Sequence, residues 1–265
     1  MNVDVIRLLR SVMRFSKPCF QFSTKQLLIG VLCASIVCVG AVRIAEAIDK
    51  KRRIDNLKQW VHIKVSHELV SLKDRFIALV LGKQYVCHVE AIGLGSEPSD
   101  QSMIDQLSEF SEAKKFTVIY HTCNSDFSPL SKLANVEEVF FEESTYGDIS
   151  YLSGMGKLKK LTIVEGGIDG GLEAIGSLNE LTHVRINLVH IPFTDESFNR
   201  FCNATSMEIL DLEHNYSFGT LENLEPLTKL RKLKSLSGLL REGNKTHLAI
   251  AELMPVNCEI KFETN

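Results

Sequence analysis

The sequence lacks the signatures of most enzymes and metal proteins. It contains no GxSxG, GxxxxGK[ST] or HExxH motif, and no GxGxxG motif after a strand, so it offers none of the usual arrangements for nucleophilic, phosphate, zinc or dinucleotide chemistry. Its seven cysteines form no CxxC pair, and no cysteine and histidine set has the spacing of zinc ligands. We therefore expect no enzymatic activity, no cofactor and no metal site, with an unrecognised catalytic site as a remote alternative.

The chain also lacks a large net charge, which is −3 from 30 basic and 33 acidic residues. With 45% apolar and 24% charged residues, this composition excludes a disordered chain and a membrane protein with several spans. The total conceals an asymmetry. Residues 1–60 carry eleven Lys and Arg against four Asp and Glu, a net of +7, and the remainder has a net of −10. Such a division indicates two parts with different roles.

Long apolar runs are scarce, since only Leu27–Val42 extends for sixteen residues without a charge. Continued past Arg43, this run reaches about twenty residues, enough to cross a hydrocarbon layer of ~30 Å as a helix. We predict a transmembrane helix at residues 27–48, preceded by a basic segment at residues 1–26. A cleaved signal peptide, with the A-x-A sequence Ala45-Glu46-Ala47, and a buried soluble helix remain open alternatives.

Four basic residues, Lys50 to Arg53, follow this run directly. Beside a membrane span, we interpret Lys50, Lys51, Arg52 and Arg53 as a contact with anionic lipid headgroups, and we expect no nucleic-acid partner. The distribution of Lys and Arg leaves the side of the membrane open. Residues 49–88 are predicted to form a juxtamembrane helix and an N-terminal cap, with a strand at Val61–Val65 and a helix at Leu69–Leu81.

An internal repeat begins after residue 88. Units of the form L-x-x-L-x-L, with other apolar residues allowed, start at Val89, Ala113, Val136, Leu158, Leu181 and Met207, with a looser copy at Leu230. The starts are separated by 24, 23, 22, 23, 26 and 23 residues, and a terminal copy ends at Phe262. Leucine-rich repeats have periods of 20 to 29 residues. We therefore predict an α/β leucine-rich-repeat solenoid of about 7–8 units at residues 89–265, because one unit cannot bury its apolar face alone.

The segment before each strand repeats an apolar residue every third position, as in Leu130, Leu133 and Val136. This spacing predicts a short helix or 3₁₀ turn that lays one face on the core. Four aspartates occupy positions where a helix N-cap is expected: Asp126, Asp148, Asp169 and Asp195.

Three short segments occur in a fixed order around these parts: FSTKQLL at Phe22–Leu28 before the predicted span, LVLGK at Leu79–Lys83 before the first repeat, and the ending MPVNCEI at Met254–Ile260. With the irregular repeats between them, this order resembles that of membrane-anchored leucine-rich-repeat proteins of planctomycete bacteria. It implies a single N-terminal span and a small repeat domain. It implies no activity and no functional residues.

Within each strand the residues between the core positions point outward, because side chains alternate along a strand. These outward residues form a candidate face for a protein or peptide partner: Glu138, Phe140, Glu142, Lys160, Thr162, His183, Arg185, Asn187, Asp211 and Glu213. Phe140 is the candidate anchor, although it is also compatible with packing against a neighbouring repeat or a covering loop. A membrane-tethered recognition module is the leading prediction, and a self-associating structural envelope protein is the alternative.

Overall fold

The computed structural model describes residues 24–58, 61–95, 101–119, 126–145, 147–190, 194–212 and 223–263. The chain divides into two compact units, Met1–Glu46 and Ala47–Asn265, which we describe separately. Trp60 and Glu213 lie outside the described residues.

In the first unit, the described residues belong to helix α2, which runs from Thr24 to Leu57 and so continues into the second unit. The apolar side chains of α2 that belong to the first unit are exposed, including Leu28 at 73% and Val37 at 69%. Among the described residues this is one helix long and apolar enough to cross a membrane, judged by length and composition, and a signal sequence passes the same test. Inside this stretch, the Ser35 hydroxyl donates to the Val31 carbonyl, which satisfies a polar group within the helix.

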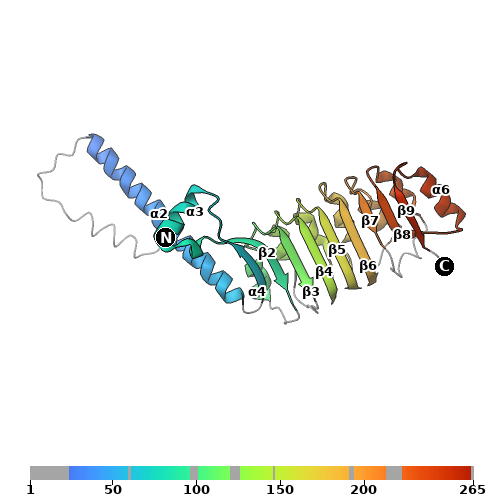
Figure 1. Cartoon of the computed structure of the whole chain (residues 1–265), viewed down its shortest axis with the longest axis horizontal. Coiled ribbons are helices and arrows are strands. Elements are labelled where there is room, and N and C mark those ends of the chain that lie inside the picture. The colour runs from blue at the N-terminus through green and yellow to red at the C-terminus, as the bar shows by residue number, and fades with distance from the viewer. Residues whose placement is uncertain are drawn as a thin grey trace, which may run out of the picture. The chain divides into compact units, whose positions relative to one another are not determined.

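The second unit contains a nine-stranded sheet whose strands lie in chain order (Figure 1). The first two strands are antiparallel and all later neighbours are parallel. The strands are β1 (His62–Ser66), β2 (His88–Leu94), β3 (Lys115–Ile119), β4 (Glu138–Thr145), β5 (Lys160–Gly167), β6 (His183–His190), β7 (Ile209–Asp211), β8 (Ser235–Arg241) and β9 (Glu259–Glu263).

The strand register confirms the leucine-rich-repeat solenoid. One core position pairs across every parallel strand, in the order Ile92, Phe116, Val139, Leu161, Val184, Leu210, Leu236 and Ile260. The first seven of these side chains are at most 2% exposed, and Ile260 packs partly buried against them. The prediction that a repeat starts at Leu230 is wrong by three residues. Because Leu236 pairs with Leu210, this copy starts at Leu233, and Leu230 belongs to the turn before it.

Short helical segments alternate with the strands and lie behind the sheet in the view of Figure 1. Their apolar residues complete the core; Leu130, Leu152 and Leu227, for example, are fully buried. The segments are α4 (Gln101–Leu107), η2 (Ser128–Lys132), η3 (Ser150–Gly154), η4 (Leu172–Ser177), α5 (Asp195–Phe201), η6 (Glu225–Lys229) and α6 (Lys245–Leu253).

The predicted aspartate N-caps differ from the observed ones. Asp126 and Asp148 each accept a hydrogen bond from the backbone N–H two residues later, at 2.8 and 2.7 Å, and thus form local turns one residue before the actual cap positions. Asp195 is the first residue of α5, and Thr194 caps that helix. Asp169 also precedes its segment, because η4 is capped by Gly171 in the left-handed region. The three 3₁₀ segments thus have no side-chain cap, whereas the α-helix α5 has one.

At the N-terminal end of the sheet β1 is the first strand, and α3 (Leu72–Leu81) and η1 (Lys83–Tyr85) follow it in the chain. Ile77 of α3 packs with Ala47 and Val86 in a small cluster separate from the core of the sheet. The last turns of α2 join the core there, since Ile54 and Leu57 are 1% and 4% exposed. Lys50 forms an ion pair with Glu112, and Arg53 with Glu109, so two of the four clustered basic residues bind the first repeat. Lys51 pairs with Asp55 at 2.6 Å within the helix. The expected lipid contact of this cluster therefore rests chiefly on exposed Arg52.

Helix α3 begins with a reciprocal cap. The Ser71 hydroxyl accepts from the Asp74 N–H, and the Asp74 carboxylate accepts from the Ser71 N–H at 2.8 Å. Burial alone would raise the pKa of Asp74, but the hydrogen bonds from Ser71 and the nearby His88 outweigh it, so the pKa lies below its usual value.

We expect Asp74→Asn to lower the free energy of unfolding by about 1 kcal/mol at neutral pH. Because the folded-state pKa is depressed, this stabilisation is complete above the ordinary aspartate pKa of about 4 and disappears as the pH falls through the folded value. Urea unfolding of both proteins at neutral and acidic pH measures the difference. A difference that grew toward acidic pH would contradict the assignment.

Candidate partner-binding face

The outward side chains of the sheet form three rows across the strands. The first row contains Lys64, Ala91, Lys115, Glu138, Lys160, His183, Ile209, Ser235 and Glu259. The second contains His62, Gly93, Thr117, Phe140, Thr162, Arg185, Asp211, Ser237 and Lys261. The third contains Ile119, Glu142, Val164 and Asn187. We call these three rows the outer face; they include all the predicted site residues except Glu213, which is not described.

Phe140 lies in the middle row of the outer face and is half-buried. Its row neighbours, Thr117 and Thr162, are much smaller. Along its own strand, Glu138 and Glu142 precede and follow it on the same face. The ring thus stands between two short side chains, with carboxylates on either side along the strand.

Arg185, Asp211 and Ser237 form a hydrogen-bonded group on the outer face. Arg185 Nε donates to Asp211 Oδ2 at 2.8 Å, and the Ser237 hydroxyl donates to Asp211 Oδ1 at 2.9 Å. Asp211 is only 8% exposed, whereas the Arg185 side chain is 60% exposed. Asp211 therefore orients Arg185 and is not itself open to a partner.

We expect Asp211→Ala to lower the free energy of unfolding by about 1–3 kcal/mol, because Arg185 and Ser237 lose their common acceptor and Ser237 is buried. Glu138→Ala is a matched control on the same face. It removes a pair with Lys115 at 2.6 Å whose side chains are 41% and 58% exposed, so its cost should stay below about 1 kcal/mol. Thermal unfolding compares the two variants, and equal losses would contradict the structural role of Asp211.

The remaining predicted residues differ in how they are held. Lys160 is exposed, and no ion pair joins it to another described residue. The His183 ring is fixed by Thr182, whose hydroxyl lies 2.8 Å from His183 Nδ1. Asn187 has a buried side-chain oxygen without a hydrogen-bond partner among the described residues. Lys160 is consequently open to a new ion pair, whereas the Asn187 oxygen is buried and not accessible to a partner.

A ladder of charges at the beginning of the strands was not predicted. Glu137 accepts from Lys114 at 3.1 Å and from Lys159 at 2.8 Å, so one carboxylate joins three successive repeats. These hydrogen bonds lower the pKa of Glu137 to about 2, and the bond from Lys159 contributes more than the bond from Lys114. Lys234 and Glu208 form an equivalent pair at 2.8 Å further along the sheet. Lys114, Glu137 and Lys159 are each the second residue of a repeat unit, so aligning the units shows the alternation of charge, while the fold shows that the side chains form ion pairs.

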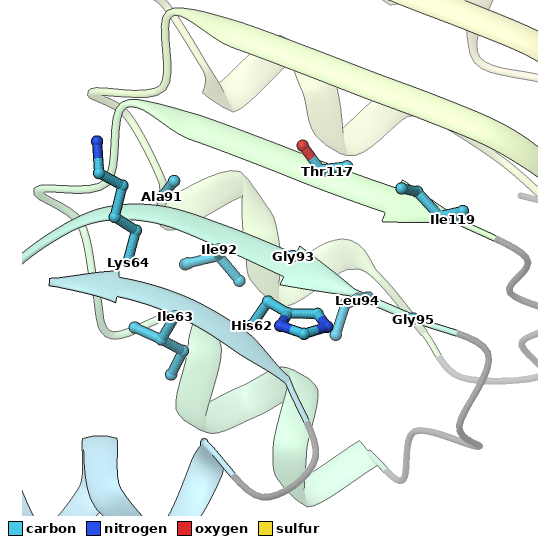
Figure 2. A pocket seen from close by; sticks show the side chains of 10 residues that line it. All are labelled: His62, Ile63, Lys64, Ala91, Ile92, Gly93, Leu94, Gly95, Thr117 and Ile119. Carbon is cyan, nitrogen blue, oxygen red and sulfur yellow. The ribbon is translucent and has the colours of Figure 1, made fainter.

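A cavity of about 650 Å³ lies at the N-terminal end of the outer face (Figure 2). Side chains from β1, β2 and β3 line it, among them His62, Lys64, Thr117 and Ile119. Gly93 leaves the second row without a side chain at this point, and a Cβ there would lie 3.3 Å from the His62 Cβ. The sequence contained one signal of this cavity, which is a glycine at an outward strand position.

Two of the cysteine thiols in the described residues are buried. Burial raises the pKa of the Cys202 thiol to about 12, and it also raises that of Cys87. No group of three or more His, Cys, Asp or Glu residues in the described ranges is arranged to hold a metal ion. The outer face is therefore the feature around which a function can be built.

No family model matches the chain, and no curated protein matches it. Solved structures with a similar fold include an internalin from Listeria monocytogenes, 21% identical with a TM-score of 0.49 over 61% of this chain and 45% of that one. They also include a second internalin, C2, of that bacterium (14%, TM-score 0.46, 65% and 74%) and a leucine-rich-repeat protein of Leptospira interrogans (16%, TM-score 0.47, 59% and 39%).

The chain thus spans less than half of the first internalin's length. At these identities the likeness concerns the fold alone. The repeat period of the sequence and the continuous register from β2 to β9 establish that fold independently: the chain is a leucine-rich-repeat solenoid with an apolar N-terminal helix.

Proposed function

We propose that this chain is a membrane-tethered recognition module that binds a protein or peptide partner through its outer face. Residues 27–48 serve as the tether, as in the membrane-anchored planctomycete proteins that the sequence resembles. The second unit, which contains the solenoid, supplies the binding surface. A solenoid presents its outward strand residues as a continuous area that neighbouring repeats hold rigid. The unit is a binding domain and not an enzyme.

The observation that carries this proposal is the environment of Phe140. A half-buried aromatic ring between two threonines offers apolar area that a partner side chain can cover. Charged groups around it, Glu138, Lys160 and Arg185, supply a polar rim of both signs. Interface anchors are typically aromatic residues surrounded by such a rim. The mixed charges favour a protein partner over a nucleic acid, which would require a mainly basic surface.

Self-association through the sheet edge is less well supported. The last strand, β9, has a neighbour on one side only, β8. Charged residues Glu259 and Lys261 occur on this edge strand, and charges at an edge oppose the addition of a further strand. At the opposite end of the sheet, β1 is likewise paired on one side only, antiparallel with β2, and it carries the exposed Lys64.

The proposal is tested by partner capture with the full chain and two outer-face variants, Phe140→Ala and Lys160→Glu. Each should reduce recovery of the same specific partner at least tenfold, which corresponds to a loss of about 1.4 kcal/mol in binding free energy.

The matched controls lie away from the outer face. Leu253→Ala truncates an exposed apolar residue of α6, and Glu173→Lys reverses an exposed charge of η4. Both should retain the partner. Retention by the outer-face variants, or equal loss by all four proteins, would contradict the assignment of this face.

A further inference from the structure

The cap helix α3 is apolar on two opposite faces. Ile77 and Leu81 belong to its inner face, where Ile77 is 3% exposed and packs with Ala47 and Val86. The opposite, exposed side of α3 carries four apolar residues, Leu72, Phe76, Leu79 and Val80, which are 81%, 41%, 85% and 49% exposed. Their spacing of four, three and one residues gathers them along one side of the helix. No described segment of the chain covers this side.

The charges around this outer side have predominantly one sign. Lys73, Arg75 and Lys83 are exposed, while the single acid of the helix, Asp74, is buried in the N-cap. Glu68 is the one exposed acid shortly before the helix. Exposed apolar side chains bordered by Lys and Arg are the composition of helices that lie in the interface of an anionic bilayer.

The position of α3 in the fold agrees with that environment. On its inner face Ile77 packs in one cluster with Ala47, which closely follows the apolar run that starts at Leu27. If that run spans the hydrocarbon core, Ala47 lies where the chain leaves it, so the residues packed around Ala47 are at the depth of the headgroups. The same level of the bilayer offers both apolar carbon and negative charge.

We infer that α3 is an interfacial helix that lies on the membrane surface, with Leu72, Phe76 and Leu79 inserted among the acyl chains and Arg75 and Lys83 against anionic headgroups. This inference rests on the proposed membrane tether. Because Ile77 is buried in the second unit, a helix held on the bilayer fixes that unit at the surface as a second attachment point besides α2.

The test uses tryptophan fluorescence of the full chain in nanodiscs of anionic lipids brominated at shallow or deep positions of the acyl chain. Trp60→Phe removes the single native tryptophan, and one new tryptophan is then introduced by Leu79→Trp, Val37→Trp or Val256→Trp. These residues are 85%, 69% and 101% exposed, so the substitutions leave the core packing intact. Val37 reports the span, and Val256, after α6, reports the C-terminal end of the sheet.

We expect the Leu79→Trp protein to lose most of its fluorescence with shallow bromines and little with deep ones. The Val37→Trp protein should be quenched most by deep bromines, and the Val256→Trp protein by neither. Adding Arg75→Glu and Lys83→Glu to the Leu79→Trp protein should weaken its shallow quenching.

If the Val37→Trp protein is quenched and the Leu79→Trp protein is not, the inference is wrong while the tether stands. If the Val37→Trp protein is not quenched, the tether itself fails. The Leu79→Trp protein could instead show a blue-shifted emission that bromines do not quench. If this shift disappeared when each nanodisc held one chain, the exposed side of α3 would bind a second copy, which also overturns the inference.

Discussion

Phe141→Ala is expected to lower the free energy of unfolding by about 3–5 kcal/mol, the usual cost of removing a fully buried phenylalanine. The Phe141 ring is 0% exposed and packs edge-on against Phe116 of the preceding repeat, with ring centroids 6.2 Å apart at 89°. Its removal leaves a cavity between two repeats that stacked strands cannot close. Urea unfolding followed by circular dichroism measures the loss.

The adjacent residue provides the matched control. Phe140 is on the outer face of the same strand, so Phe140→Ala should cost less than about 1 kcal/mol in stability while it removes the proposed anchor. Two neighbouring phenylalanines therefore separate stability from binding. A loss of stability for Phe140→Ala as large as that for Phe141→Ala would show that Phe140 belongs to the core.

Gly176→Ala is the second substitution with a large expected effect. A Cβ at Gly176 would lie less than 3.0 Å from the backbone oxygen and carbon of Arg200, at the contact between η4 and α5. Because backbone atoms cannot rotate away as a side chain does, the two repeats must separate. We expect a loss of about 2–3 kcal/mol or more in unfolding free energy.

Gly156→Ala is the corresponding control, because nothing lies within 4 Å of a Cβ built at Gly156. It should leave the free energy of unfolding within a few tenths of a kcal/mol of that of the native protein or raise it slightly. If both glycine variants unfolded alike, the close approach at Gly176 would not limit the stacking of these repeats.

The repeat period was enough to predict the solenoid and most strand positions. A leucine every third residue before each strand marks a buried turn, and alternation within the strand separates core from outer face, so Phe141 and Phe140 could be assigned to opposite sides. The error at Leu230 has the same origin. Leu230, Leu233 and Leu236 are equally spaced, and only pairing with Leu210 shows which of them begins the strand unit.

Properties that depend on contacts between repeats could not be predicted. Asp211 was expected to face a partner, but its burial results from Arg185 and Ser237, which are 26 residues away on either side. The sequence predicts a lipid contact for the basic cluster after the apolar run, yet Lys50 and Arg53 pair with Glu112 and Glu109 of the first repeat. The sequence shows which charges exist, and only the fold shows which of them meet.

The central claim, that the outer face binds a protein or peptide, is tested most directly by site-specific photocrosslinking of the full chain. A photoreactive amino acid is placed at Thr162 on the outer face, or at Glu173 in η4 on the other side of the sheet. The account predicts a discrete crosslinked partner from Thr162 that disappears with Phe140→Ala, and none from Glu173. Crosslinks from Glu173 alone, or crosslinks from Thr162 that persist unchanged in the Phe140→Ala protein, would contradict it.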